Sequence, residues 1–224
     1  MITKKHKLII YGTGKLAEYA YFVFTHDSEY EVVCFCIETE FMPSTTQHRL
    51  GLPIYDLGKI AEHFPSVEYH IFVAVGNNSV RDRIYAKIST MNYTFANYLS
   101  SKSQYWFDCQ LGNNVFISEG CVIQPFVSIG NNTLIFSSII GHHSTIETNV
   151  TLSGCTIGGS VTVEKNTFIG MNATINQNLK VGMNNIIGVG CNIIRDTRDG
   201  EVYSAIKSKL RLFSSSRIFS NFLK

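Results

Sequence analysis

An aliphatic residue returns every six positions between Leu111 and Ile193. Neither an α-helix, with a period of 3.6, nor a simple strand, with a period of 2, repeats at six. A six-residue period is typical of a parallel β-helix, in which each repeat supplies one short strand and one turn. Three repeats close one coil, so the pattern predicts about five coils over residues 105–195. The repeat positions are Leu111, Ile117, Ile123, Ile129, Ile135, Ile140, Ile146, Leu152, Ile157, Val163, Ile169, Ile175, Val181, Ile187 and Ile193.

Two steps of the repeat are five residues long instead of six. We expect the residues of a catalytic site to lie beside these two steps. The first, from 135 to 140, directly precedes His142 and His143, and the second, from 152 to 157, shortens a coil so that His142 should lie over Gly159. Histidine can accept a proton near neutral pH, and an unobstructed glycine N–H can hold a developing oxyanion. The alternative is a pair of ordinary surface histidines at a turn. Two histidines beside a break in the register and opposite Gly159 favour a catalytic site.

Composition excludes several other classes of site and protein. A zinc site needs three or more protein ligands, and the repeats hold no third histidine, so we expect no metal. The six scattered cysteines form no C-x-x-C pair, which favours a reduced, cytoplasmic protein. A formal net charge of +2 argues against nucleic acid as the main partner. No run of 18 apolar residues is present, so no membrane-spanning helix is expected.

The N-terminal region has the pattern of a small Rossmann-like domain, which we bound at residues 1–100. An apolar strand over 7–11 runs into Gly12-Thr13-Gly14-Lys15-Leu16-Ala17 and then a helix over 16–24. This strand, glycine-rich turn and helix can bring backbone amides to a phosphate. A second strand, 30–37, ends at Glu38, whose carboxylate would either meet a ribose hydroxyl or be solvated.

A further strand over 70–75 leads into Gly76, Asn77 and Asn78 and a helix over 80–91. Arg81 and Arg83 in the first turns of this helix oppose its dipole, so a phosphate or carboxylate partner competes with a solvated face. After the β-helix, residues 196–224 form a tail of alternating basic and apolar residues. The tail could contact a membrane or a partner, or pack on the end of the β-helix.

Both halves together resemble the bacterial sugar acetyltransferases of the PglD and NeuD type. The resemblance rests on four segments: Tyr11–Gly14, Val75–Ile84, Gly141–Ile146 and Gly159–Ala173. It implies a left-handed β-helix that forms a homotrimer and binds acetyl-CoA between neighbouring subunits. It also implies that the N-terminal domain holds a nucleotide-linked amino sugar.

The resemblance also implies roles for individual residues. His142 would be the catalytic base, with His143 beside it where the family often has an acid, and the Gly159 amide would face the thioester oxygen. The implied substrate-binding residues are Gly12, Thr13, Gly14, Lys15, Glu38, Gly76, Asn77 and Asn78. The implied acetyl-CoA-binding residues are Gly159, Ser160, Gly170, Met171, Asn172, Ala173, Gly188 and Lys207.

The expected function is acetyl-CoA-dependent N-acetylation of a UDP- or dTDP-linked amino-deoxysugar, in the synthesis of a surface glycan such as O-antigen or lipopolysaccharide. Acetylation of a sugar hydroxyl, as on a sialic acid, is one alternative. The absence of a carboxylate after His142 favours transfer to an amine, because a hydroxyl depends more on an oriented base. A non-catalytic protein that binds nucleotide sugars is the other alternative.

Overall fold

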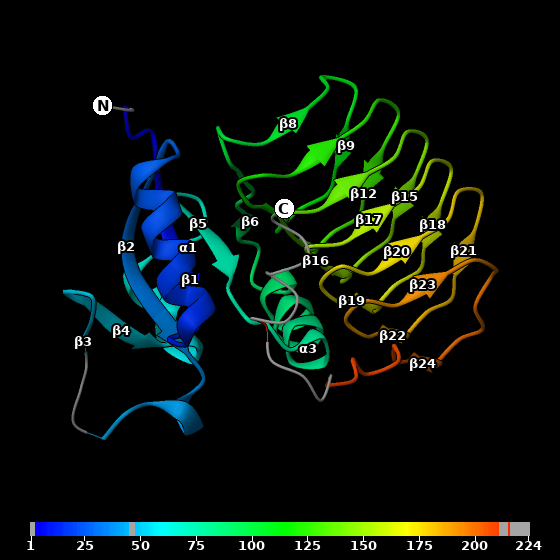
Figure 1. Cartoon of the computed structure of the whole chain (residues 1–224). Helices are drawn as coiled ribbons and strands as arrows, with labels where there is room; N and C mark the ends of the chain where they lie inside the picture. The colour runs from blue at the N-terminus through cyan, green and yellow to red at the C-terminus, as the bar shows by residue number, and fades with distance from the viewer. Residues whose placement is uncertain (1–2, 45–47, 211–214, 216–224) are drawn as a thin grey trace.

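The computed structural model describes residues 3–44, 48–210 and 215. Most of the apolar and basic tail residues, 211–214 and 216–224, therefore lie outside the described residues, as does any membrane contact they make. In Figure 1 a twisted sheet and a stack of flat coils lie side by side, with one helix, α3, between them. No helix within the described ranges is long and apolar enough to cross a membrane.

The N-terminal domain is built on a six-stranded sheet with the order β3-β4-β2-β1-β5-β6. Every pairing is parallel except that of β3 with β4. The strand order reverses at β1, because the chain adds β2 on one side of β1 and later adds β5 on the other. The carboxyl ends of β1, β2 and β5 therefore lie together at one edge of the sheet, which is where parallel α/β sheets bind ligands. The strands are β1 (His6–Tyr11), β2 (Tyr30–Ile37), β3 (His48–Arg49), β4 (Leu52–Asp56), β5 (Tyr69–Val73) and β6 (Thr94–Phe95).

Two twelve-residue helices accompany this sheet, α1 (Lys15–His26) and α3 (Asn78–Ser89). The α3 helix starts two residues before the expected position, because the Asn77 side chain accepts a hydrogen bond from the Val80 N–H and so caps the first turn. Short helical turns fill the remaining connections. These are η1 (Thr39–Phe41), η2 (Leu57–Lys59) and α2 (Ile60–His63).

The second domain is a parallel β-helix, as the six-residue period predicts. Its strands form three sheets of seven, six and five members, each stacked in parallel register. The first sheet holds β7 (Tyr98–Leu99), β10 (Phe116–Ile117), β13 (Leu134–Phe136), β16 (Thr151–Ser153), β19 (Phe168–Ile169), β22 (Ile186–Ile187) and β24 (Val202–Tyr203). The second holds β8 (Gln104–Tyr105), β11 (Val122–Ile123), β14 (Ile139–Ile140), β17 (Thr156–Ile157), β20 (Thr174–Ile175) and β23 (Asn192–Ile193). The third holds β9 (Gln110–Leu111), β12 (Ser128–Ile129), β15 (Thr145–Ile146), β18 (Thr162–Val163) and β21 (Lys180–Val181).

The coils have the two lengths that the repeat predicts. Ile157 pairs with Ile175, eighteen residues on, whereas Ile140 pairs with Ile157, only seventeen residues on. The aliphatic residues of the repeat point inward and form one buried column, together with Cys121, Cys155 and Cys191. These cysteines pack as small apolar residues, and burial raises the pKa of the Cys155 thiol to about 11.

Nearly every turn of the β-helix passes through a left-handed residue three positions before an inward aliphatic. Asn fills this position at 114, 132, 149, 166, 172, 178 and 184, and Gly fills it at 120, 154 and 190. Both residue types tolerate positive φ at little cost. Phe126, with φ of 64°, and His143, with φ of 59°, are bulky exceptions at this position.

The two domains share one apolar core. Phe116 and Leu134 point outward from the first β-helix sheet and are fully buried against Phe24 and Phe72 of the N-terminal domain. The rings of Phe72 and Phe116 lie 5.7 Å apart. The β-helix therefore packs on the N-terminal domain through side chains that no single domain could bury alone.

Candidate active site at a corner of the β-helix

His142 lies at the corner between the second and third sheets, in the turn that joins β14 to β15. The Gly159 turn of the next coil lies beneath it, as the seventeen-residue spacing predicts. A Cβ atom on Gly159 would lie 2.8 Å from His142 Cε1 and 2.9 Å from His142 Nε2. The imidazole ring therefore packs against the bare Cα of Gly159, and any side chain at 159 would displace it.

The Gly159 peptide supplies a free donor beside this ring. The neighbouring Ser160 N–H donates to the His142 carbonyl oxygen over 2.7 Å, and the Gly159 carbonyl accepts from Asn178. Within the described part of the chain, no group accepts a hydrogen bond from the Gly159 N–H. An unpaired amide next to an imidazole can hold a developing oxyanion while the ring takes a proton.

His142 and His143 form a hydrogen-bonded pair. Their Nδ1 atoms lie 3.1 Å apart and their rings meet edge to face. The main chain holds both residues, because the His142 N–H donates to the Gln124 side chain and the His143 N–H donates to the Pro125 carbonyl. Phe126, a residue that we did not predict for the site, stacks obliquely on His143 with ring centroids 4.6 Å apart.

The residues expected to bind acetyl-CoA do not gather at this corner. Ser160 lies at the His142 corner, whereas Gly170, Met171 and Asn172 lie at the corner between the first and second sheets. Gly188 lies on that same second corner, and Lys207 lies exposed beyond β24. The Ala173 side chain is buried in the inner column, so only its main chain could meet a ligand.

The glycine-rich turn of the N-terminal domain has the expected geometry. Gly12 follows β1 with φ of +116°, and a Cβ there would lie 2.9 Å from the Ala74 carbonyl, so glycine is required. Thr13 is half-buried, and Gly14 and Lys15 are exposed at the start of α1. Nothing lies within 4 Å of a Cβ built on Gly14, so a ligand has room to approach the helix amides.

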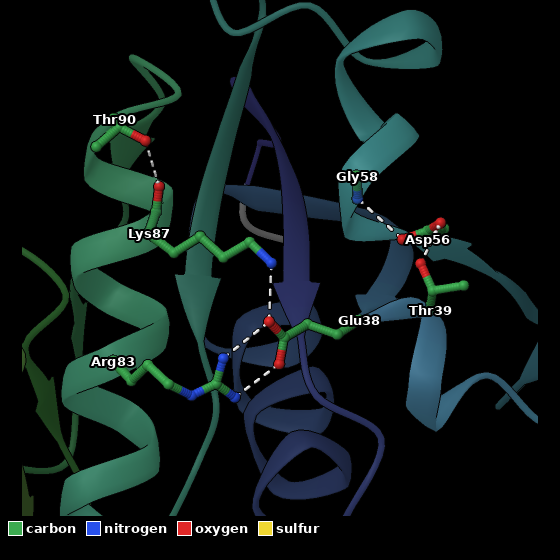
Figure 2. A network of polar contacts seen from close by, with 7 residues as sticks. All are labelled: Glu38, Thr39, Asp56, Gly58, Arg83, Lys87 and Thr90. Atoms are coloured by element: carbon green, nitrogen blue, oxygen red, sulfur yellow. Dashed lines mark hydrogen bonds and ion pairs between the residues drawn. The ribbon is translucent and has the colours of Figure 1, made fainter.

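Glu38, at the end of β2, is held by cations rather than solvated. Figure 2 shows its carboxylate between Arg83 and Lys87 of α3. Both oxygens accept from Arg83, over 2.8 and 2.6 Å, and one also accepts from Lys87 over 2.8 Å. These hydrogen bonds, above all those from Arg83, lower the pKa of Glu38 to about 2. The solvated alternative for Glu38 is wrong, and its contact with a ribose stays a prediction.

Gly76, Asn77 and Asn78 lie where α3 meets the β-helix. They border a hollow of about 350 Å³ that is also lined by Asn166 and Phe168. The Asn78 side chain donates to the Asn149 and Asn166 carbonyls and accepts from Thr151, so it binds the β-helix itself. Gly76 and Asn77 remain exposed at the mouth of the hollow.

Arg81 is fully buried between the domains, so the expectation of a solvated face is wrong for this residue. Its guanidinium donates to the Val75, Gly76, Asn132 and Asn149 carbonyls and to the side chains of Asn78 and Thr151. Burial lowers its pKa to about 10, so the group stays charged at neutral pH. No group of three metal-ligating side chains occurs among the described residues.

Known proteins show the same division of the chain. Residues 7–88 match the family model of the PglD N-terminal domain, and residues 97–189 match that of the GMPPB C-terminal domain. Together the two matches span the sheet domain and most of the β-helix.

Several solved structures of acetyltransferases superpose on most of the chain. The acetyltransferase domain of PglB from Neisseria gonorrhoeae is 20% identical over 88% of this chain and 96% of its own, with a TM-score of 0.79. A mutant of perosamine N-acetyltransferase from Caulobacter crescentus, in complex with CoA and GDP-perosamine, is 20% identical over 88% and 92%, with a TM-score of 0.77. WeeI from Acinetobacter baumannii is 17% identical over 88% and 96%, with a TM-score of 0.75. These similarities confirm the fold, a Rossmann-like domain followed by a left-handed β-helix.

Proposed function

We propose that this protein transfers an acetyl group from acetyl-CoA to the amine of an amino-deoxysugar linked to a nucleoside diphosphate. The observation that carries the proposal is the His142 ring packed on Gly159, whose N–H has no acceptor in the described structure. Acyl transfer needs a base and an oxyanion donor within a few ångströms of each other, and this corner holds both. The complexes of similar proteins with CoA and GDP-perosamine support the choice of co-substrate and acceptor.

The reaction we propose is a direct transfer without an acyl-enzyme. The sugar amine attacks the thioester carbonyl, forming the C–N bond, while the Gly159 N–H binds the oxyanion. His142 Nε2 takes the proton that the amine loses, and the C–S bond then breaks. The same proton can pass from His142 to the departing CoA thiolate, so the histidine ends the cycle neutral.

We propose that the nucleotide sugar lies along the carboxyl edge of the N-terminal sheet, by Gly12, Thr13 and Gly14. The α1 N-terminus supplies amide donors suited to a diphosphate. Gly76 and Asn77 border a hollow at the same edge that has room for part of such a ligand. We propose that the nucleotide is UDP, dTDP or GDP. We place the reaction in the cytoplasm, in the synthesis of a surface glycan.

We further propose that the working unit is a homotrimer. His142 lies at the corner between the second and third β-helix sheets, whereas Gly76 and Asn77 lie at α3, which Asn78 ties to a different corner through Asn149 and Asn166. Within one chain, the base and the proposed sugar-binding edge therefore lie at different corners of the three-sided β-helix. A second copy that brings its His142 corner to this edge would complete the site, and a closed threefold ring would do so for all three chains.

The test is a screen for CoA thiol release with UDP-, dTDP- and GDP-linked amino-deoxysugars, each paired with the sugar that has a hydroxyl in place of the amine. Release that depends on the amine supports the proposal. Release with the hydroxyl sugar alone would favour the O-acetyltransferase alternative. A failure to release thiol or to bind acetyl-CoA would favour a non-catalytic binding protein.

A further inference from the structure

The His142–His143 contact constrains where the protons of the pair reside. A neutral imidazole carries one N–H and one lone pair, on opposite nitrogens. Because the two Nδ1 atoms lie 3.1 Å apart, one of them must donate and the other must accept. If His143 donated, His142 Nε2 would carry a hydrogen and could not act as a base. If His142 donates, its Nε2 keeps the lone pair, and His143 carries its hydrogen on Nε2.

We infer that His143 accepts the His142 Nδ1 hydrogen, and that Phe126 is a positioning residue that holds His143 in the orientation this requires. The inference rests on the proposed function for the direction of the hydrogen bond, since only this direction leaves a base. When His142 Nε2 takes a proton, its Nδ1–H still donates to His143, and a hydrogen bond from a charged donor is stronger. His143 thereby stabilises the imidazolium without receiving a proton itself.

The position of Phe126 supports this role. It is a bulky residue in the left-handed conformation, and it is 63% exposed although it is apolar. Backbone strain and an exposed apolar ring both carry a free-energy cost, and such costs concentrate at functional sites. The ring nevertheless contacts His143, with centroids 4.6 Å apart.

Asp108, one coil before Phe126, secures this turn. The Asp108 Oδ2 atom accepts a hydrogen bond from the Phe126 N–H over 2.7 Å. The turns stacked around the histidine pair otherwise contribute Gln124, Gly159 and Ser160, which carry no charge. Contacts thus run from Asp108 through Phe126 and His143 to His142, across three successive coils, and none of the first three residues needs to touch substrate.

The tautomers can be read in the resting protein by NMR of ¹⁵N-labelled histidine at neutral pH, with His142→Gln and His143→Gln variants to assign the signals. We expect His142 to carry its hydrogen on Nδ1 and His143 on Nε2. A His142 ring with its hydrogen on Nε2 would overturn the inference. This measurement uses no substrate, so it can succeed or fail whether or not the protein acetylates a sugar.

Phe126→Leu tests the positioning role, and Phe107→Leu is the matched control. Phe107 lies in the turn one coil earlier, is 96% exposed and makes no ring contact with His143. With Phe126→Leu we expect kcat to fall about tenfold with KM nearly unchanged, because the base is misoriented. The His142 signals should also show a mixture of tautomers. Unchanged kcat and an unchanged tautomer in Phe126→Leu would overturn the role of Phe126.

Discussion

At the scale of single residues, His142 is the side chain on which the proposed chemistry depends. Replacing it with alanine removes the base but leaves the main-chain bonds of its turn, so the fold should persist. We expect kcat to fall by roughly 10²–10⁴ with a modest change in KM, since a positioned general base contributes about that much. Steady-state kinetics with acetyl-CoA and the best sugar from the screen would measure the change.

The matched control for His142→Ala is His63→Ala, which removes an exposed histidine from α2 in the other domain. Its kcat should stay within about twofold of the parent, in line with a substitution outside the reacting centre. Near-parental turnover by His142→Ala would remove this histidine from the mechanism.

The spacing of the repeat was sufficient to predict that His142 lies over Gly159, because register along a β-helix follows from counting residues. The role of Phe126 could not be predicted by the same count. Its signal was a phenylalanine at the turn position that Asn or Gly usually fills, three residues before Ile129. Whether such a ring meets a neighbour depends on side-chain direction, which residue spacing does not determine. The ion pair of Glu38 with Arg83 and Lys87 could not be predicted either, because it depends on how α3 packs across the sheet.

At the scale of elements, α3 joins the two domains through Arg81. Its guanidinium is fully buried and donates to four carbonyl oxygens and two side chains. Arg81→Met keeps much of the volume but leaves the Val75, Gly76 and Asn132 carbonyls without their donor, at a cost of about 1–3 kcal/mol for a buried unsatisfied group. We therefore expect the free energy of unfolding to fall by at least about 2 kcal/mol, measured by urea denaturation.

Arg83→Met, two residues along the same helix, is the control for Arg81→Met. Arg83 has a half-exposed side chain, and Lys87 would remain to pair with Glu38. The loss should be smaller than for Arg81→Met. Equal losses would show that Arg81 contributes no more than an exposed ion pair.

Element boundaries were less predictable than element types. The strand–glycine–helix pattern at Gly12 and the period of the β-helix rest on strong local signals, and both elements form as expected. The predicted boundary at residue 100 places Tyr98 and Leu99 in the first domain, yet β7 pairs with β10 and so belongs to the β-helix. A two-residue strand carries no period of its own, so only the pairing partner could assign it.

At the scale of the whole molecule, the proposed trimer predicts that two inactive variants can restore activity together. One is His142→Ala, which lacks the base. The other is Gly14→Asp, which places a negative charge at the α1 N-terminus where nothing lies within 4 Å of the new Cβ, so the fold should tolerate it. After unfolding and refolding as a mixture, about a quarter of the intersubunit sites should have both intact parts.

The assay for this prediction is CoA release by the mixture compared with each variant refolded alone. Restored activity requires that the base and the sugar-binding edge come from different chains. If the site lay within one chain, every site in the mixture would carry one of the two defects, and the mixture would remain inactive.

The apolar core that Phe116 and Leu134 share with Phe24 and Phe72 has a consequence for how such proteins can diverge. A gene fusion that joined this β-helix to a foreign nucleotide-binding domain would leave Phe116 and Leu134 facing water, and the exposed apolar surface would favour aggregation. New acceptor specificities should therefore arise by substitution at the proposed sugar-binding edge of the N-terminal sheet, with the two domains inherited as one unit.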